Sequence, residues 1–219
     1  MTMTINTQTA PTNALGFDCN TVLNASTAQA FVTAGFTFAV RYLSLTPSIR
    51  PGDLTLSEVE TILQSGLALM AVQHVLYAGW SPTQQLGFQN GNSAAACAQA
   101  AGLPAGINVW LDLEGINPNA QASDVIAYCN AWFSVVDAAG YVSGLYVGAN
   151  CILTGDQLYN DLNVSAYWRS GSTVPMVPNR GYCMVQTISN SYRVAGVAYD
   201  QDVIQADNNG NTPTWAIAA

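Results

Sequence analysis

The sequence contains no lysine, one histidine and few charges of either sign. Its five basic residues are all arginines, and 13 acidic residues give a formal net charge of −8 over 219 residues. Charged residues make up 8% of the chain, against roughly a quarter in an average soluble protein. Because phosphate binding requires clustered lysine and arginine, we expect no nucleic-acid partner and no anionic membrane surface. Uncharged, hydrogen-bonding ligands such as sugars suit this composition better.

Long apolar runs are also absent, although half of the residues are hydrophobic. No segment approaches the roughly 18 to 20 apolar residues of a membrane span, so we expect no membrane partner. Residues 1–15 are rich in threonine and asparagine, without a basic start or an apolar run, and do not resemble a Sec-type signal peptide. The localisation therefore stays open between the cytoplasm, export by a non-classical route and a signal already removed.

Cysteine pairs and histidine clusters are missing too. The cysteines stand far apart, without a Cys-x-x-Cys, and most lie in apolar segments: Cys19, Cys97, Cys129, Cys151 and Cys183. We expect buried free thiols rather than a disulfide framework. A single histidine argues against a zinc site, and neither a glycine-rich phosphate loop after the first strand nor Gly-x-Ser-x-Gly is present. We therefore expect no metal and no cofactor.

What the chain does contain is an alternation of apolar runs and capped helices. Strands are predicted at 14–18, 38–42, 67–75, 107–112, 144–148, 165–168, 182–186 and 198–203. Helices are predicted at 24–34, 55–66, 84–101, 123–139 and 156–161, several with Ser, Thr or Asn caps and a following glycine. This order is typical of βαβ units and a parallel sheet buried on both faces. It predicts a single (β/α) TIM-type barrel with an incomplete outer helix ring.

An open doubly wound sheet is the alternative fold, disfavoured by the missing phosphate loop. The length suits one domain, and the chain shows neither an internal repeat nor an interdomain linker. We predict a flexible N-terminal segment over residues 1–14, the barrel over 15–207 and a C-terminal tail over 208–219 that adds little. We expect a monomer.

Carboxylates follow several of the predicted strands, where a parallel barrel places its functional groups. Asp18 ends the first strand, Asp112 and Glu114 end the fourth, and Asp200 and Asp202 flank the last. Strand alternation puts Asp112 and Glu114 on the same face, about 6.5 to 7 Å apart along the strand. Two acids so close cannot both ionise cheaply, so the more buried one should keep its proton toward neutral pH. Glycoside cleavage needs such a protonated acid together with an ionised carboxylate.

Aromatic and amide side chains lie near the same strand ends, where they could stack on sugars and bond hydroxyl groups. Aromatic residues serve equally well as core packing. The substrate-binding candidates are Tyr42, His74, Tyr146, Trp168, Gln186 and Asp200. Arg41 is expected either to neutralise a carboxylate at the barrel mouth or to form a structural ion pair. Glu58, on a predicted helix, is expected to be a solvated residue or a cap.

Four segments together resemble a known family. They are Gly-Phe-Asp at 16–18, Phe-Ala-Val-Arg-Tyr-Leu-Ser at 38–44, Leu-Thr-Leu-Ser-Glu at 54–58 and Gly-Leu-Tyr-Val-Gly at 144–148. In this order they are similar to the glycoside-hydrolase-like family formerly catalogued as domain of unknown function 1906, which is related to the family 25 lysozymes. The resemblance covers about residues 15–205. It implies an incomplete (β/α) barrel with acidic residues after strands one and four and elsewhere at the mouth.

Carried over by position, the resemblance implies that Glu114 is the general acid/base. Asp112 would orient or stabilise the N-acetyl group of the substrate or the charge that develops, Asp18 would shape the sugar site, and Asp202, or else Asp200, would complete the acidic cluster. The chain departs from the lysozymes at 184–187, where Met-Val-Gln-Thr stands in place of a Trp-Gln-Tyr sugar platform.

The leading hypothesis is a glycosidase of the lysozyme (muramidase) type that acts on an N-acetylated glycan polymer such as bacterial peptidoglycan. A catalytically silent glycan-binding barrel and a structural or assembly protein are the alternatives, because family membership alone does not establish catalysis.

Overall fold

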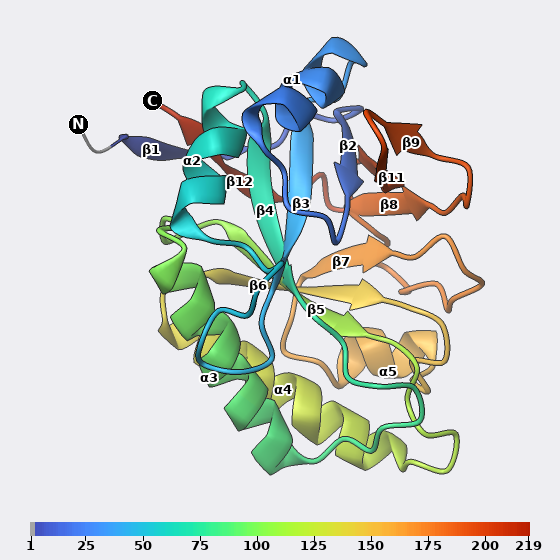
Figure 1. The fold of residues 1–219 in the computed structure, drawn as a ribbon. Coiled ribbons are helices and arrows are strands. Elements are labelled where there is room, and N and C mark those ends of the chain that lie inside the picture. Colours follow the sequence, from blue (N-terminus) through green and yellow to red (C-terminus); the bar gives the residue numbers. More distant parts are fainter. Residues whose placement is uncertain (1–2) are drawn as a thin grey trace.

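Eight strands close into a barrel in the computed structural model, which describes residues 3–219 (Figure 1). In chain order they are β2 (Leu15–Asp18), β3 (Phe38–Leu43), β4 (Ala68–Gln73), β5 (Asn108–Leu113), β6 (Val142–Val147), β7 (Ala166–Arg169), β8 (Met184–Thr187) and β11 (Asp200–Ile204). Each strand pairs with the next one along the chain, and β11 pairs with β2 to close the ring. The predicted TIM-type barrel is confirmed, and the open sheet is excluded.

One barrel strand runs against the others. Strands β2 to β8 are parallel to their neighbours, whereas β11 is antiparallel to both β2 and β8. The parallel sheet that the sequence predicts is therefore wrong for the last strand. A short hairpin of β9 (Arg193–Val194) and β10 (Val197–Ala198) joins β8 to β11, and without a crossover the chain returns antiparallel. The first residue of β11, Asp200, consequently lies opposite Asp18, at the mouth of the barrel.

Helices follow the first five barrel strands only. They are α1 (Ala25–Thr33), α2 (Leu56–Gln64), α3 (Gln84–Ala100), α4 (Ala122–Ala138) and α5 (Gly155–Asn160). Between residues 170 and 199 the structure has no helix, so the outer ring is incomplete, as predicted. Helices α3 and α4 lie side by side (Figure 1) because Gly87 allows close approach: a Cβ there would lie 2.2 Å from the carbonyl oxygen of Tyr128. No helix within residues 3–219 has the length and apolar character needed to cross a membrane.

Large side chains fill the interior of the barrel, and glycines make room for them. A Cβ on Gly16 would lie 2.2 Å from the ring of Phe38, and one on Gly144 would lie 2.4 Å from the ring of Trp110. Trp110 in turn packs edge-on against Trp168, with ring centroids 5.9 Å apart. Several polar side chains of the barrel lie where the parallel strands finish, among them Asp18, Asp112 and Gln186.

The two chain ends pair with each other beside the barrel. Strand β1 (Ile5–Thr9) is antiparallel to β12 (Thr214–Ala218), and β12 also pairs with β4; Figure 1 shows the two ends next to each other. Trp215 of β12 is buried against Phe38. The sequence predicts a flexible segment and a tail that adds little, but each contains a strand. The paired residues of β1 and β12 are about 200 positions apart in the chain, so no local sequence pattern reveals the pairing.

Arg41 forms a structural ion pair, one of the two expectations for it. It is fully buried, and its Nε donates to Glu58 Oε1 at 2.7 Å. Glu58 also accepts from the backbone N–H of Leu23 at 2.8 Å. The expectation of a solvated Glu58 is therefore wrong: the residue is buried because a buried arginine requires a partner of opposite charge. All five cysteines are free and buried.

Candidate functional site

An acidic hollow of about 150 Å³ opens at the end of the barrel where the parallel strands finish. Side chains from seven strands, or from the loops just after them, meet there: Tyr42, Val72, Asp112, Glu114, Tyr146, Trp168, Gln186, Ile188 and Asp200. Seven of these nine residues are among the candidates that the sequence predicts. The barrel closure brings them together although they span some 160 positions of the chain.

Asp112 points into the barrel from β5, because its neighbours Leu111 and Leu113 belong to the core between the strands and the helices. Its side chain lines the hollow, yet the residue is only 7% exposed, and its Oδ1 has no hydrogen-bond partner among the described residues. Burial, the charge of Glu114 and the charge of Asp18 raise the pKa of Asp112 well above its ordinary value. Burial and the two neighbouring carboxyl groups therefore favour the protonated form of Asp112.

Glu114 follows β5 directly and is half-buried at the rim of the hollow. It packs on Gly148, which follows β6: a Cβ on Gly148 would lie 2.4 Å from Glu114 Cβ and 2.7 Å from Oε2. The indole Nε1 of Trp80 donates to the backbone carbonyl of Glu114 at 2.9 Å. Burial and the charge of Asp200 raise the pKa of Glu114. The site thus contains an accessible, well-positioned carboxyl group with an increased affinity for its proton.

A hydrogen-bond network fixes the residues around Asp18. Its carboxyl group accepts from Tyr42 Oη at 3.1 Å and from Gln186 Nε2 at 2.7 Å. The amide oxygen of Gln186 accepts from Tyr146 Oη at 2.8 Å. Burial raises the pKa of Asp18 to about 7, against the hydrogen bond from Gln186 and together with the charge of Asp200. Asp18 therefore orients the amide and phenol groups that line the hollow.

The two acidic residues of β11 lie at different depths. Asp200 is half-buried and lines the hollow, and burial raises its pKa. Asp202 is 0% exposed, lines none of the described hollows and accepts from Trp168 Nε1 at 3.0 Å. Because β11 enters the barrel from the mouth, Asp202 lies two residues deeper on the same face. Burial and the charge of Asp18 raise its pKa well above the ordinary value. Of the two, Asp200 is the residue at the mouth.

His74 lies next to the acidic hollow but not in it. Its Nε2 is 2.7 Å from Asp53 Oδ1, and its ring stacks on Tyr42 with 4.6 Å between centroids. It lines a second hollow of about 430 Å³ together with Asn20. A third hollow of about 350 Å³ shares Asn20 with the second hollow and Tyr42 and Asp200 with the acidic one. The three hollows therefore adjoin one another at the barrel mouth, and together we call them the mouth cleft.

Sequence reasoning missed several residues of this region. Val72 and Ile188 line the acidic hollow, Asp53 contacts His74, and Gly148 supports Glu114. Of these residues, only Gly148 could have been found from the sequence, because it is the last residue of the Gly-Leu-Tyr-Val-Gly segment at a predicted strand end.

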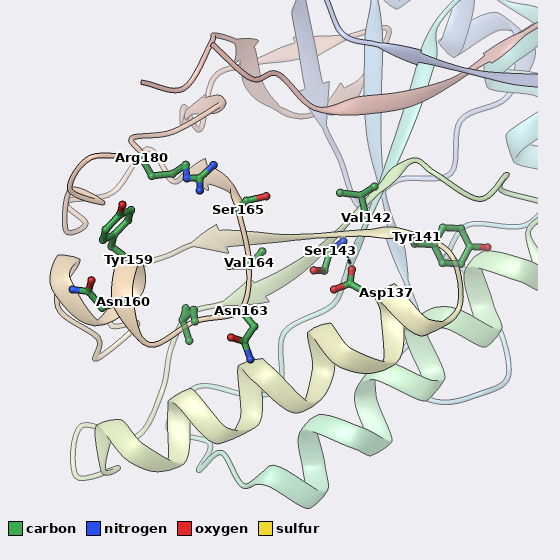
Figure 2. Close-up of a pocket in the computed structure, with 11 residues that line it drawn as sticks. Asp137, Tyr141, Val142, Ser143, Tyr159, Asn160, Asn163, Val164, Ser165 and Arg180 are labelled. Carbon is green, nitrogen blue, oxygen red and sulfur yellow. Dashed lines mark hydrogen bonds between the residues drawn. The ribbon is translucent and has the colours of Figure 1, made fainter. Parts of the chain in front are cut away.

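A larger hollow of about 700 Å³ lies at the opposite end of the barrel, where β6 and β7 begin (Figure 2). The side chains around it include those of Asp137, Ser143, Asn163 and Arg180. Its single carboxylate, Asp137, accepts a hydrogen bond from the backbone N–H of Ser143 at 2.9 Å. It therefore lacks the paired carboxylates that make the acidic hollow a candidate for catalysis.

Several solved structures share this fold, among them the following three. Tat-secreted protein Rv2525c from Mycobacterium tuberculosis, in complex with L-tartrate, has a TM-score of 0.67 at 21% identity, covering 92% of this chain and 99% of that one. A bacterial lysozyme from Streptomyces coelicolor has a TM-score of 0.59 at 14% identity, covering 92% and 100%. The autolysin LytC from Streptococcus pneumoniae, in complex with a synthetic peptidoglycan ligand, has a TM-score of 0.60 at 10% identity, covering 88% and 46%.

Among curated proteins, none matches this chain. The family model for the Rv2525c-like, glycoside hydrolase-like domain matches residues 29–215, which include the Asp112–Glu114 pair and Asp200. This match confirms the resemblance that the sequence segments indicate, and the closed barrel agrees with it. The chain belongs to the Rv2525c-like glycoside hydrolase-like domain family.

Proposed function

We propose that this protein is a glycoside hydrolase of the muramidase type, which cleaves an N-acetylated glycan such as bacterial peptidoglycan. The observation that carries the proposal is the acidic hollow: three carboxyl groups line it beside aromatic and amide side chains, and no basic residue does. Its carboxyl groups have raised pKa values for a stated physical cause, as perturbed groups at functional sites do. The shared fold with a lysozyme and with an autolysin that binds a peptidoglycan ligand supports this class of substrate.

Glu114 acts as the general acid in this proposal. Its proton passes to the glycosidic oxygen while the bond from that oxygen to the anomeric carbon breaks, so the bonding electron pair stays on the leaving alcohol. Positive charge then develops at the anomeric carbon. In the second half of the reaction, Glu114 takes a proton from the water whose oxygen bonds to that carbon, and both the enzyme and the proton balance are restored.

Asp112 stabilises this positive charge when its carboxyl group is ionised. Ionising it is costly, because it is buried near Glu114 and Asp18. Its proton passes to solvent water before the glycosidic bond breaks, and the resulting carboxylate stabilises the positive charge at the anomeric carbon, which in turn favours the ionised form. Asp112 lines the hollow, so its carboxylate accepts a hydrogen bond from the amide N–H of an N-acetyl group of the bound substrate. Asp18 shapes the sugar site through the hydroxyl of Tyr42 and the amide of Gln186.

The test is release of soluble muropeptides from purified peptidoglycan. Glu114→Gln should lower the rate by about 10² to 10⁴, the contribution of a general acid, while glycan binding stays largely intact. Glu60→Gln is the matched control, since Glu60 lies on α2 and lines none of the described hollows. If Glu114→Gln hydrolyses as fast as the wild type, the catalytic assignment is wrong. If the wild type retains glycan but releases nothing, the glycan-binding barrel replaces the hydrolase.

A further inference from the structure

The few arginines of the chain are distributed unevenly around the mouth cleft. Arg41 is paired with Glu58 at 2.7 Å, and Arg180 lies 3.7 Å from Asp207. Arg50 and Arg193 form no ion pair within residues 3–219, and each lines one of the two hollows beyond the acidic one. In a chain with a net charge of −8 and no lysine, the two exposed, unpaired cations that line the mouth cleft therefore lie outside the hollow of the proposed catalytic carboxylates.

The backbone of Arg50 is held in place while its guanidinium is left free. The backbone N–H of Arg50 donates to Ser44 Oγ at 2.9 Å, and the backbone N–H of Asp53 donates to the carbonyl of Arg50 at 3.1 Å. Both oxygens of Asp53 are already engaged, one by Ser44 Oγ at 2.5 Å and the other by His74 Nε2 at 2.7 Å. The carboxylate of Asp53, which lines the same hollow, is thus engaged by Ser44 and His74, and Arg50 is available for an external anion.

The arginine of this hollow suits a carboxylate. A guanidinium offers a planar fork of donors that matches both oxygens of a carboxylate, and this charge-assisted pair is stronger than a neutral hydrogen bond. The amide of Asn20 and the ring of His74 line the same hollow and provide further polar contacts. Arg193, whose Nη1 is held by the carbonyls of Asn190 and Tyr192, adds positive charge in the hollow between this one and the acidic site.

We propose that the hollow lined by Asn20, Arg50, His74 and the already engaged Asp53 is a subsite for a carboxylate carried by a substituent of the glycan. The substrate class is then a carboxylate-bearing glycan rather than a neutral N-acetylated polymer. This inference rests on the proposed function for its place beside the catalytic carboxylates. The positive charge of Arg50 offsets the local repulsion between an acidic protein and an acidic ligand. Salt at physiological concentration screens that repulsion only beyond about 8 Å.

Calorimetric binding to two soluble probes tests the subsite without requiring turnover. One probe is a neutral tetramer of N-acetylglucosamine, and the other is a peptidoglycan tetrasaccharide with free stem-peptide carboxylates. Arg50→Gln should weaken binding of the acidic probe about tenfold, the loss expected for one hydrogen-bonded charge pair, and should change binding of the neutral probe less than twofold. Arg50→Lys should recover part of the loss. Arg169→Gln removes the same charge from an exposed residue that lines none of the described hollows and should leave both probes unchanged.

Three results would overturn the subsite. They are equal losses in Arg50→Gln and Arg169→Gln, equal losses for the two probes in Arg50→Gln, and no binding of the acidic probe by the wild type. The muramidase proposal fails separately, on the release of muropeptides. Selective loss of the acidic probe without hydrolysis would leave the subsite standing on a glycan-binding barrel.

Discussion

Asp18 should make the protein less stable as the pH rises. Burial raises its pKa from the ordinary 3.8 to about 7, against the hydrogen bond from Gln186 and together with repulsion from Asp200. Between these two pH values the folded protein binds more protons than the unfolded chain, so the free energy of unfolding falls with increasing pH. At about 1.36 kcal/mol for each pH unit, the whole change is on the order of 4 kcal/mol. About 3 kcal/mol of it lies between pH 5 and pH 8.

Urea unfolding followed by tryptophan fluorescence at pH 5, 6, 7 and 8 measures this change, and the range stays above the sequence pI of about 4.1. Asp18→Asn resembles the protonated acid and keeps an oxygen for Gln186. It should be more stable than the wild type at pH 8 and lose less stability between pH 5 and pH 8. The remaining raised pKa values, those of Asp112 and Asp202 among them, act in the same direction in both proteins.

Asp161→Asn, a substitution of an exposed acid at the end of α5, should follow the wild type. A wild-type free energy of unfolding that is constant or increases from pH 5 to pH 8 would refute the reasoning. So would an Asp18→Asn curve parallel to that of the wild type, because the buried carboxylate would then cost nothing to ionise.

Four further outcomes follow from the site and its surroundings. Gly148→Ala would place a Cβ 2.4 Å from that of Glu114, so we expect kcat on peptidoglycan to fall at least about tenfold as the general acid moves; unchanged kcat would show that the glycine is not needed there. The rate should follow a bell in pH whose two limbs belong to the coupled pair of Glu114 and Asp112, because Glu114 must be protonated while Asp112 is ionised; in Asp112→Asn the rate should fall, and an unaltered profile would exclude Asp112 as the partner of Glu114. Glu58→Gln should cost about 3 to 5 kcal/mol of unfolding free energy by leaving the Arg41 charge buried without its partner, and a loss below 1 kcal/mol in urea unfolding would contradict this. Thiol titration of denatured, unreduced protein should detect all five cysteines, and a shortfall of two would reveal a disulfide.

Local sequence was enough to predict most of the barrel. The strands from β2 to β6 are short, mostly apolar runs near helix caps or glycines, and these signals act within a few residues of one another. The same holds for Asp112 and Glu114, since the alternation of a single strand places them on one face. Asp18 was found in this way too, because it ends a recognisable strand.

Long-range pairing decided what the local signals leave open. Strands β1 and β12 pair only because the two chain ends meet, and β11 runs antiparallel only because no crossover helix precedes it. That reversal puts Asp200 at the mouth and Asp202 inside the barrel. The burial of Glu58 against Arg41 and the contact of Gly148 with Glu114 likewise depend on packing between separate elements. The sequence by itself determined which residue types reach the strand ends, through a periodicity of two. The tertiary structure alone decided their depth and partners, because both depend on which strands become neighbours.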